Sequence, residues 1–227
     1  MEKDLTILIP ALNEEKTIEI VIKKAEEYIK SKKINGEILI ANNGSIDKTK
    51  ELAMKLGARV VDIETKGYGI TIIEGIKNAN GNYIIIGDAD DSYNFLELDD
   101  FVQAFNEGYD IVIGNRYGKV MEKGSMKISH KYIGTPILGW LIRKKYKKTI
   151  HDINCGLRGG KKEKLINLDC NCDGMEFASE MMIKAIKKNM KIKEVPINFY
   201  KDGRSHASHL NTVRDGIRHL KVLLKRS

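Results

Sequence analysis

Hydrophobic and polar positions in the first half of the chain follow two alternating patterns. Short apolar runs rich in β-branched residues, typical of buried strands, alternate with stretches whose apolar residues recur at every third or fourth position, as in amphipathic helices. The predicted strands cover residues 5–10, 37–41, 59–63, 83–87 and 110–114. The predicted helices cover residues 14–29, 46–56, 69–78 and 95–106, with Asn13 as the N-cap of the first. Such a series of β-α units predicts an α/β fold with a mostly parallel central sheet flanked by helices.

The last predicted helix, residues 212–226, combines an apolar face with many basic residues. The apolar residues that share a face are Val213, Ile217, Leu220 and Leu224. The adjoining basic residues are Arg214, Arg218, Lys221 and Lys225. Two hypotheses fit this pattern: an interfacial helix that binds anionic lipid, or a helix packed on the domain with its basic flank in solvent. Trp140 poses the same choice between a membrane-interface anchor and a core residue.

Length and composition are those of one ordinary globular domain. The chain has 227 residues, of which 42% are hydrophobic, enough for a full core. No apolar segment reaches the length of a membrane span, and the N-terminus has no signal-peptide pattern. The three cysteines are an odd number, which favours reduced thiols. We therefore expect a cytoplasmic protein, with peripheral contact at the cytoplasmic membrane face if the terminal helix binds lipid.

The net charge of +8 indicates that the partners of this protein are anionic. Lys and Arg number 39 against 31 Asp and Glu, and the excess is concentrated in residues 143–148 and 214–226. Such a surface suits anionic substrates, an anionic membrane or nucleic acid. A nucleotide- or nucleic-acid-binding protein without enzymatic activity is therefore one open alternative. Against it, the aromatic residues are not interleaved with the basic clusters as they are in stacking platforms for nucleic acid.

The clearest chemical signal is a pair of carboxylates, Asp88 and Asp90, directly after the predicted strand 83–87. In parallel sheets the loops that follow successive strands meet at one edge, so residues 10–14, 42–47 and 88–90 should face a common cleft. Carboxylates suit Mg2+ or Mn2+, which usually share their ligands with substrate phosphates. The amide side chains suit a nucleobase and ribose, and no Gly-x-Gly-x-x-Gly follows the first strand, which argues against a dinucleotide-binding fold.

These motifs, in this order, carry a resemblance to a known family. The first-half motifs are Pro-x-x-Asn-Glu at 10–14, Asn-Asn-Gly-Ser-x-Asp at 42–47, Lys-Gly-x-Gly at 66–69 and Asp-Ala-Asp at 88–90. Together they resemble the nucleotide-sugar half of family 2 glycosyltransferases with the GT-A fold. The second-half motifs are Gly-Asn-Arg at 114–116, Cys-Gly-Leu-Arg at 155–158, the segments 174–180 and 195–197, and Gly-Arg-Ser at 203–205. They resemble the polyprenyl-phosphate branch, the relatives of dolichol-phosphate mannose synthase.

The resemblance implies a single GT-A domain, with residues 1–115 binding a nucleotide-diphosphate sugar and residues 116–227 binding the acceptor. The implied donor-binding residues are Pro10, Ala11, Asn13, Glu14, Asn42, Asn43, Lys66, Asp88 and Ala89. Asp90 is the main ligand expected for Mg2+ or Mn2+, with Asp88 beside it. Asn42 stands where relatives commonly have Asp, so the choice between GDP- and UDP-linked donors stays open.

The acceptor implied by the resemblance is a polyprenyl phosphate, to which the sugar is transferred with inversion. Arg116, Arg158, Arg204 and Ser205 are the residues implied to bind its phosphate. The implied catalytic residues are Asp90, Arg116, Arg204 and Glu180. A phosphate is already ionised near neutral pH, so positioning and charge neutralisation would replace a general base. For Glu180, pairing with a nearby arginine is an equally good interpretation as catalysis.

An alternative within the same enzyme class is transfer to a soluble acceptor, such as a protein, a small molecule or a modified nucleobase. The sequence names neither the sugar nor the oligomeric state.

Overall fold

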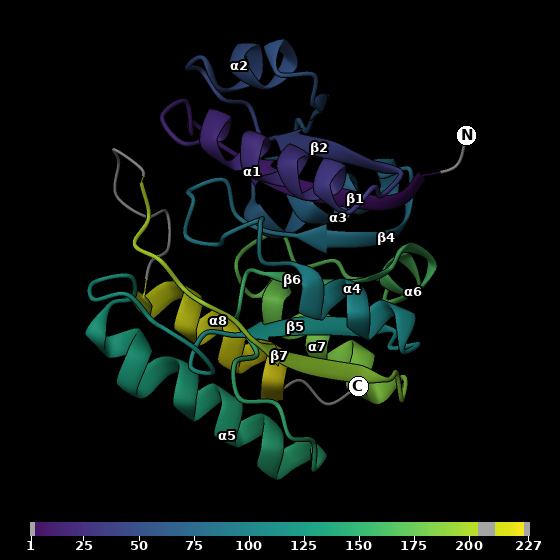
Figure 1. Ribbon diagram of the computed structural model, residues 1–227. Helices are drawn as coiled ribbons and strands as arrows, with labels where there is room; N and C mark the ends of the chain where they lie inside the picture. Colours follow the sequence, from purple (N-terminus) through teal and green to yellow (C-terminus); the bar gives the residue numbers. More distant parts are fainter. Residues whose placement is uncertain (1–2, 204–211, 225–227) are drawn as a thin grey trace.

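The computed structural model describes residues 3–203 and 212–224. A seven-stranded sheet in the order β3-β2-β1-β4-β6-β5-β7 forms its centre. Helices α1 and α4 lie on one face of the sheet, joined by a hydrogen bond from the Tyr28 hydroxyl to Asp99 at 3.0 Å. Helix α3 lies on the other face and contacts α6 and α7 (Figure 1). The α/β fold with a mostly parallel sheet is confirmed.

The first four strands are parallel and form the most regular part of the sheet. They are β1 (Lys3–Ala11), β2 (Gly36–Asn42), β3 (Arg59–Asp62) and β4 (Gly81–Ile86). The helices that connect them are α1 (Ile18–Ser31), α2 (Thr49–Lys55) and α3 (Tyr68–Asn78). Every strand and helix predicted in this region exists, although α1 and α2 begin later than the apolar pattern indicates. Strand β1 lies between β2 and β4, and helices cover both faces of the sheet there, so its apolar side chains on both faces are buried.

The prediction that Asn13 caps the first helix is wrong. Helix α1 begins at Ile18 after Thr17, whose side chain makes no capping hydrogen bond. Asn13 instead has a positive φ of 57°, and its Oδ1 accepts a hydrogen bond from the backbone N–H of Ile46 at 2.8 Å. Asn tolerates this left-handed conformation better than most residues. Residues 13–17 therefore form a turn that ties the loop after β1 to the loop after β2.

The second half completes the sheet with one antiparallel strand that the sequence pattern does not reveal. The elements are α4 (Asp99–Asn106), β5 (Ile111–Asn115), β6 (Arg158–Lys161), α6 (Lys162–Asn167), α7 (Phe177–Lys187) and β7 (Ile192–Pro196). Strand β6 runs antiparallel between β4 and β5. Its sequence is Arg-Gly-Gly-Lys, which has no apolar run, because the two glycines pack against neighbouring backbone where a side chain would not fit.

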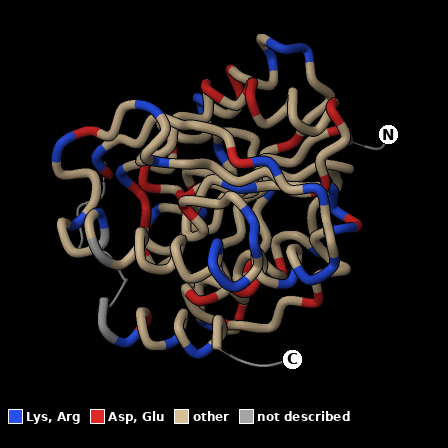
Figure 2. The backbone as a smooth tube through the Cα atoms, turned by 90° about the horizontal axis from the view of Figure 1, so that it is seen from below, with Lys and Arg blue, Asp and Glu red and all other residues tan. Residues whose placement is uncertain are grey.

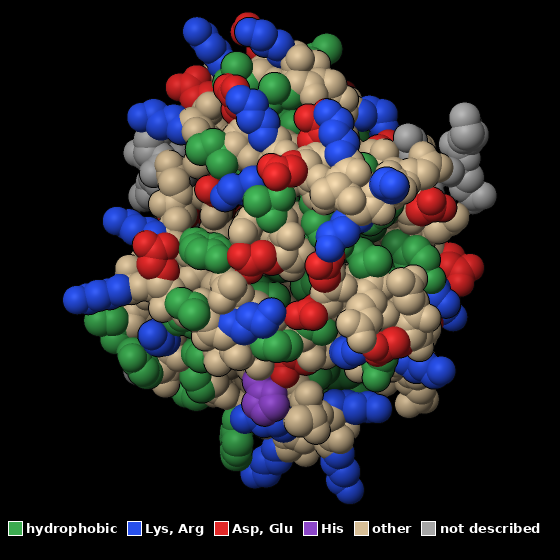
Figure 3. Space-filling view, in the orientation of Figure 1, with side chains coloured by type: hydrophobic (Ala, Val, Ile, Leu, Met, Phe, Trp, Pro, Cys, Tyr) green, Lys and Arg blue, Asp and Glu red, His purple; other side chains and the backbone are tan. Residues whose placement is uncertain are grey.

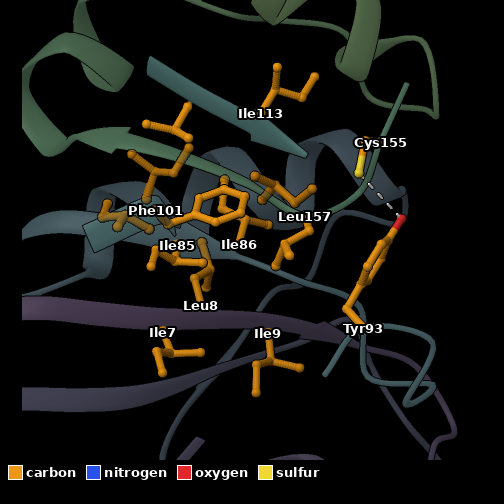
Figure 4. Close-up of a cluster of buried hydrophobic side chains, with 14 of the residues drawn as sticks. Ile7, Leu8, Ile9, Ile85, Ile86, Tyr93, Phe101, Ile113, Cys155 and Leu157 are labelled. Atoms are coloured by element: carbon orange, nitrogen blue, oxygen red, sulfur yellow. Dashed lines mark hydrogen bonds between the residues drawn. The ribbon is translucent and has the colours of Figure 1, made fainter. Parts of the chain in front are cut away.

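The core lies on both sides of the central strands. Ile7, Leu8 and Ile9 of β1 pack with Ile85 and Ile86 of β4 around the junction of the two halves (Figure 4). In the same close-up, Tyr93 points toward Cys155, whose Sγ lies 3.9 Å from the tyrosine hydroxyl. None of the three cysteines, all within the described residues, is in a disulfide.

Two helices lie at the lower edge of the molecule in Figure 1: α5 (Thr135–Tyr146), preceded by a π-helical turn η1 (His130–Gly134), and α8 (Thr212–Leu224). Viewed from below, the tube of α8 carries several Lys and Arg positions on its way to the C-terminus (Figure 2). No helix in the described ranges is both long enough and apolar enough to cross a membrane.

The face that α8 turns to the domain differs from the predicted apolar face. Its buried side chains are Asp215, His219 and Leu223, whereas Ile217 is 50% exposed and Leu224 is 68% exposed. The side chain of Val213 lies outside what the structure describes. Helix α8 is therefore packed on the domain, as the hypothesis of a packed helix predicted. Most of the apolar face noted in the sequence nevertheless remains on the surface, as the hypothesis of an interfacial helix required.

The close approach of β6 to β4 gives a stability prediction. A Cβ built on Gly159 would overlap the carbonyl oxygen of Ile84, which is part of the sheet backbone and has little room to move. Gly159→Ala should therefore lower the free energy of unfolding by about 1–3 kcal/mol in urea titrations. The control is Gly216→Ala, because a Cβ on this α8 glycine meets nothing within 4 Å. It should be neutral or stabilising, by about 0.5–1 kcal/mol. Equal effects of the two substitutions would contradict the packing of β6.

Candidate functional site

A cavity of about 350 Å³ opens at the carboxyl edge of the parallel strands. Its walls come from the loops after β1, β2 and β4, the start of α3, the loop before α7, and α8. The lining residues predicted from the sequence are Pro10, Ala11, Glu14, Asn43, Lys66, Asp88, Ala89 and Asp90. Leu12, Gly67, Tyr68, Thr71, Gly174, Met175, Arg214, Asp215 and Arg218 complete the lining. The expectation that the three strand-end loops share a cleft is thus met by this arrangement.

Asn43 fixes the geometry of the cavity wall formed by two loops. Its Nδ2 donates to the carbonyl oxygens of Ile63 at 3.1 Å and Thr65 at 2.8 Å, and its Oδ1 accepts from the N–H of Gly67 at 2.9 Å. Lys66, which precedes Gly67 in the loop between β3 and α3, donates from Nζ to the carbonyl oxygens of Asn43 at 2.7 Å and Gly44 at 3.3 Å. This mutual bonding places the Lys66 side chain at the cavity.

Asn13 and Asn42 do not line the cavity. Asn42 is buried, with its Nδ2 donating to Asp62 Oδ1 at 2.7 Å and its Oδ1 accepting from the N–H of Ser45 at 3.2 Å. Asn13 accepts from Ile46 as described above, and its N–H donates to Ser45 Oγ at 3.0 Å. Both residues shape the loops that surround the cavity, and their predicted direct contact with a nucleotide finds no support in this geometry.

Asp88 lies at the cavity and is held by a tyrosine that the sequence analysis did not single out. The hydroxyl of Tyr68 donates to Asp88 Oδ1 at 2.9 Å. Burial, reinforced by the negative charge of Asp88, raises the pKa of Tyr68 well above its ordinary value, so the tyrosine stays a proton donor. Gly156 makes room for the carboxylate, because a Cβ at this position would lie 2.5 Å from Asp88 Oδ2. The motif Cys-Gly-Leu-Arg thus contributes a small residue beside Asp88.

Asp90 is only 4% exposed. It lies in the loop after β4, residues 87–92, which we call the acidic loop and which folds around its side chain. Its Oδ1 accepts from the N–H of Ser92 at 3.0 Å and from Ser92 Oγ at 2.6 Å. The N–H of Gly203 donates to the backbone carbonyl of Asp90 at 2.9 Å, which draws the segment after β7 onto the acidic loop. The neighbouring Asp91 points elsewhere and pairs with Lys24 at 2.7 Å.

The donor set fits a hard divalent cation of the type expected. Two carboxylates at a strand end supply the one or two protein ligands that Mg2+ commonly takes, with substrate phosphates and water filling the rest of its shell. Within the described residues no cluster of three His, Cys, Asp or Glu side chains forms a complete protein cage. Asp88 and Asp90 are therefore the residues that would hold Mg2+ or Mn2+.

Arg116 and Arg158, predicted to bind the acceptor phosphate, are bonded to protein partners; Arg158 is buried, and the side chain of Arg116 is 12% exposed. Arg116 makes a bidentate ion pair with the buried Asp152, with both nitrogen–oxygen distances 2.7 Å, and lies over the ring of Phe199. Arg158 donates to the backbone carbonyls of Ala178, Ile153 and Cys155. Neither lines the cavity, so this geometry favours structural roles. Arg204 and Ser205 lie outside the described residues.

Glu180 also has a structural environment. It is buried, its Oε2 accepts from the N–H groups of Asn171 at 3.0 Å and Cys172 at 2.8 Å, and its Oε1 pairs with Lys184 at 2.9 Å. Burial alone would raise its pKa, but the hydrogen bonds from Cys172 and Lys184 outweigh burial and lower it. Its charge partner is a lysine, where we expected an arginine. The side chain does not line the cavity; it orders the loop that brings Gly174 and Met175 there.

The polar cavity residues that no sequence prediction assigned are Tyr68, Thr71 and three residues of α8: Arg214, Asp215 and Arg218. Tyr68 stands inside the Lys-Gly-x-Gly motif, so its position offered a signal. The basic residues of α8 were expected to face either anionic lipid or solvent, and nothing in the pattern of the helix itself shows that one edge of it lines the cavity with the carboxylates.

Comparison with known proteins identifies the family. The model of glycosyl transferase family 2 matches residues 6–169. The hexosyltransferase Agl6 of low-salt glycan biosynthesis from Haloferax volcanii is 34% identical over 221 residues, which cover 97% of this chain and 53% of Agl6, so the chain spans about half the length of that relative. A dolichyl-phosphate hexose transferase from the same organism is 27% identical, covering 86% of this chain and 82% of the relative.

A solved structure shares the fold. Glucosyl-3-phosphoglycerate synthase from Mycobacterium tuberculosis, crystallised with Mn2+, UDP and glucosyl-3-phosphoglycerate, matches with a TM-score of 0.77 at 19% identity, over 98% of this chain and 79% of that one. The GT-A fold expected from the motifs is confirmed, and the extent of the family match settles the family itself. The chain belongs to glycosyl transferase family 2.

Proposed function

We propose that this chain transfers a sugar from a nucleoside-diphosphate sugar to a polyprenyl phosphate, with inversion at the sugar carbon. The observation that carries the proposal is the convergence of Asp88, Asp90, Asn43 and Lys66 on one cavity at the carboxyl edge of the parallel strands. Family membership and the relative named as a dolichyl-phosphate hexose transferase support it. Residues 1–115 would bind the donor, and residues 116–227 would bind the acceptor and close the cavity.

The proposed chemistry is a single displacement. A phosphate oxygen of the acceptor attacks the anomeric carbon as the bond from that carbon to the donor diphosphate breaks, and the leaving group departs as nucleoside diphosphate. The attacking phosphate is already ionised, so no residue needs to remove a proton. A bound Mg2+ or Mn2+ would neutralise charge on the leaving diphosphate. The protein must position the two reactants and reduce the repulsion between their negative charges.

Asp88 and Asp90 would hold the metal, and Tyr68 would orient Asp88 through its hydroxyl hydrogen bond. Lys66, already directed to the cavity by the carbonyl oxygens of Asn43 and Gly44, would contact the donor phosphates. Ser92 would hold Asp90 in position through two hydrogen bonds. The choice between UDP and GDP is best made by a donor screen with both nucleotides.

A soluble phosphorylated acceptor is the second candidate. It is favoured by the structural relative solved with glucosyl-3-phosphoglycerate, whose acceptor is a small phosphorylated molecule. An acceptor screen with dolichyl phosphate, a short-chain isoprenyl phosphate and 3-phosphoglycerate separates the two functions. Turnover with both isoprenyl phosphates and none with phosphoglycerate supports the leading proposal, and the reverse pattern contradicts it.

We also propose peripheral contact with an anionic membrane through the outer sides of α5 and α8. Trp140 of α5 is 51% exposed with Lys144 Nζ 4.9 Å from its ring, and Ile217, Leu220 and Leu224 of α8 are exposed. Lys145 Nζ donates to the carbonyl oxygen of Leu223 at 2.5 Å, which joins the two helices. Figure 3 shows hydrophobic side chains among Lys and Arg over α5. Exposed apolar side chains with basic neighbours are typical of proteins that bind anionic lipid surfaces.

The metal assignment predicts a large loss of activity in Asp90→Asn. A metal ion contributes several kcal/mol of charge stabilisation, and each ~1.4 kcal/mol is a factor of ten, so turnover should fall about a hundredfold or more. The matched control is Asp91→Asn, because Asp91 pairs with Lys24 and Asn tolerates its positive φ of 63°. It should stay within a few-fold of the unaltered protein. Near-normal turnover of Asp90→Asn with added Mn2+ would remove Asp90 from the metal site.

The membrane proposal predicts that Ile217→Ser/Leu220→Ser weakens co-sedimentation with phosphatidylglycerol vesicles about tenfold, given ~1.5–3 kcal/mol for fully burying one such side chain. Binding to phosphatidylcholine vesicles should be weak throughout, and salt should lower binding to anionic ones. These substitutions spare Leu223 and His219, which deletion of α8 would remove from the core. Met54→Ser, which alters an exposed apolar residue on α2, is the control. Equal binding by all three proteins would exclude this surface.

A further inference from the structure

Helix α8 forms part of the cavity wall through residues of its first two turns. Arg214, Asp215 and Arg218 line the same cavity as Asp88 and Asp90. Arg214 and Arg218 are four residues apart, so they lie one above the other on one side of the helix. We propose that these two arginines form a phosphate-binding arm of the active-site cavity. This proposal rests on the proposed function, because it assigns residues to one of the phosphate groups that the reaction brings together.

The position of α8 against the domain is set by buried contacts on its other side. Leu223 is buried in the core, and the buried His219 lies 2.7 Å from Ser179 Oγ of α7 through Nδ1. Lys145 of α5 donates to the last turn through the carbonyl of Leu223. These contacts fix the rotation of the helix about its axis. The two arginines therefore reach the cavity because of how α8 is packed, and their position does not depend on lipid.

Each guanidinium is anchored by an acid that is itself buried. Arg218 Nη1 lies 3.6 Å from Glu176 Oε2, which is too long for a hydrogen bond, and Arg214 Nε lies 3.2 Å from Asp215 Oδ1. Glu176 is 8% exposed, and its Oε2 has no hydrogen-bond partner among the described residues. A buried carboxylate oxygen left in this state is unfavourable and calls for an explanation. We explain the buried charge of Glu176 by its attraction for Arg218, which holds the guanidinium at the edge of the cavity.

Gly174 provides the space for this arrangement. A Cβ at this position would lie 2.6 Å from Arg218 Nη1 and 2.5 Å from Glu176 Oε2. The loop that contains Gly174 is itself held by the carbonyl of Asp173, which accepts from the N–H of Gly69 at 2.8 Å. The segment 174–176 therefore contributes two lining residues, Gly174 and Met175, the space for the guanidinium of Arg218, and the acid that orients it.

The chemistry of arginine points to phosphate as the ligand. The guanidinium is planar and always charged, and it binds two oxygens of a phosphate at once. Of the cavity-lining residues that the structure describes, the basic ones are Lys66, Arg214 and Arg218. Lys66 contacts the loop after β2, whereas the side chains of Arg214 and Arg218 are 65% and 47% exposed and so are accessible to a ligand. Arg158 is buried and Arg116 is largely enclosed by its pair with Asp152, and neither lines the cavity, so the α8 pair is the better placed of these arginines to bind a phosphate there.

The phosphate belongs either to the acceptor or to the donor diphosphate, and binding experiments distinguish the two. The variant is Arg214→Ala/Arg218→Ala in the full chain, with Arg214→Lys/Arg218→Lys as the conservative replacement. The control, Lys187→Ala/Lys188→Ala at the end of α7, removes the same number of positive charges away from the cavity. Calorimetry is performed with two water-soluble probes, citronellyl phosphate and UDP or GDP with Mn2+, so that membrane binding does not enter the result.

We expect the double Ala variant to bind one probe at least tenfold more weakly, the Lys variant to recover part of that loss, and the control to stay within twofold. A loss confined to citronellyl phosphate assigns the arm to the acceptor, and a loss confined to the nucleotide assigns it to the donor. Unchanged affinity for both probes, or an equal loss in the control, overturns the proposal. If the unaltered protein binds neither probe, the proposed function itself fails, which is a different result from a variant that binds as the unaltered protein does.

Discussion

The parallel pairing of β1 with β2 on one side and with β4 on the other determines where the functional side chains of this protein lie. Ile7 is in register with Ile38 of β2 and with Ile85 of β4, and the three strands run in the same direction, so their carboxyl ends lie at the same edge of the sheet. Their following loops therefore meet at one edge, where the polar groups of Asn43 and the carboxylates of Asp88 and Asp90 become neighbours. The hydrophobic core that fixes this register is what holds like charges close together at the cavity.

Several charged residues of the second half stabilise the cavity walls without lining them. In the bidentate pair of Arg116 with Asp152 the carboxylate is fully buried, and removing the partner of a buried charge typically costs ~3–5 kcal/mol because that charge is left unpaired. Arg158 donates a hydrogen bond to a backbone carbonyl of α7, and Glu180 accepts hydrogen bonds from backbone N–H groups of the loop before α7. Substituting these residues would change the shape of the site, so a loss of activity in such variants would not distinguish catalysis from folding.

Helix α8 faces three environments at once. Its inner side packs on α7 through His219 and Leu223, one edge contributes Arg214 and Arg218 to the cavity, and its outer side exposes Ile217 and Leu224. A polyprenyl phosphate is itself a molecule with an anionic head and an apolar tail. A helix with cations at the cavity and apolar side chains on its outer side matches that division, which gives a physical reason for the two proposals about α8 to concern the same substrate.

The fold class, the elements of the first half and the pair of carboxylates could all be predicted from the sequence. Hydrophobic periodicity reports local burial, and the run 83–87 is apolar because β4 is buried on both faces. The motif order also carried the family. Strand β6 could not be predicted from the hydrophobic pattern. Gly159 and Gly160 are needed there because the backbone of neighbouring strands comes close to them, and this requirement leaves no periodic signal in the sequence.

Which charged residues face the cavity could not be predicted from the sequence and follows from the packing of the folded chain. A sequence states that Arg116, Arg158, Arg214 and Arg218 are cations, but it does not state which of them meet a buried acid or a backbone carbonyl. Packing of α8 through His219 and Leu223 turned Arg214 and Arg218 to the site, and the pairing of Arg116 with Asp152 took that arginine out of it. The direction of a side chain depends on contacts between residues far apart in the chain, and these contacts exist only once the core has formed.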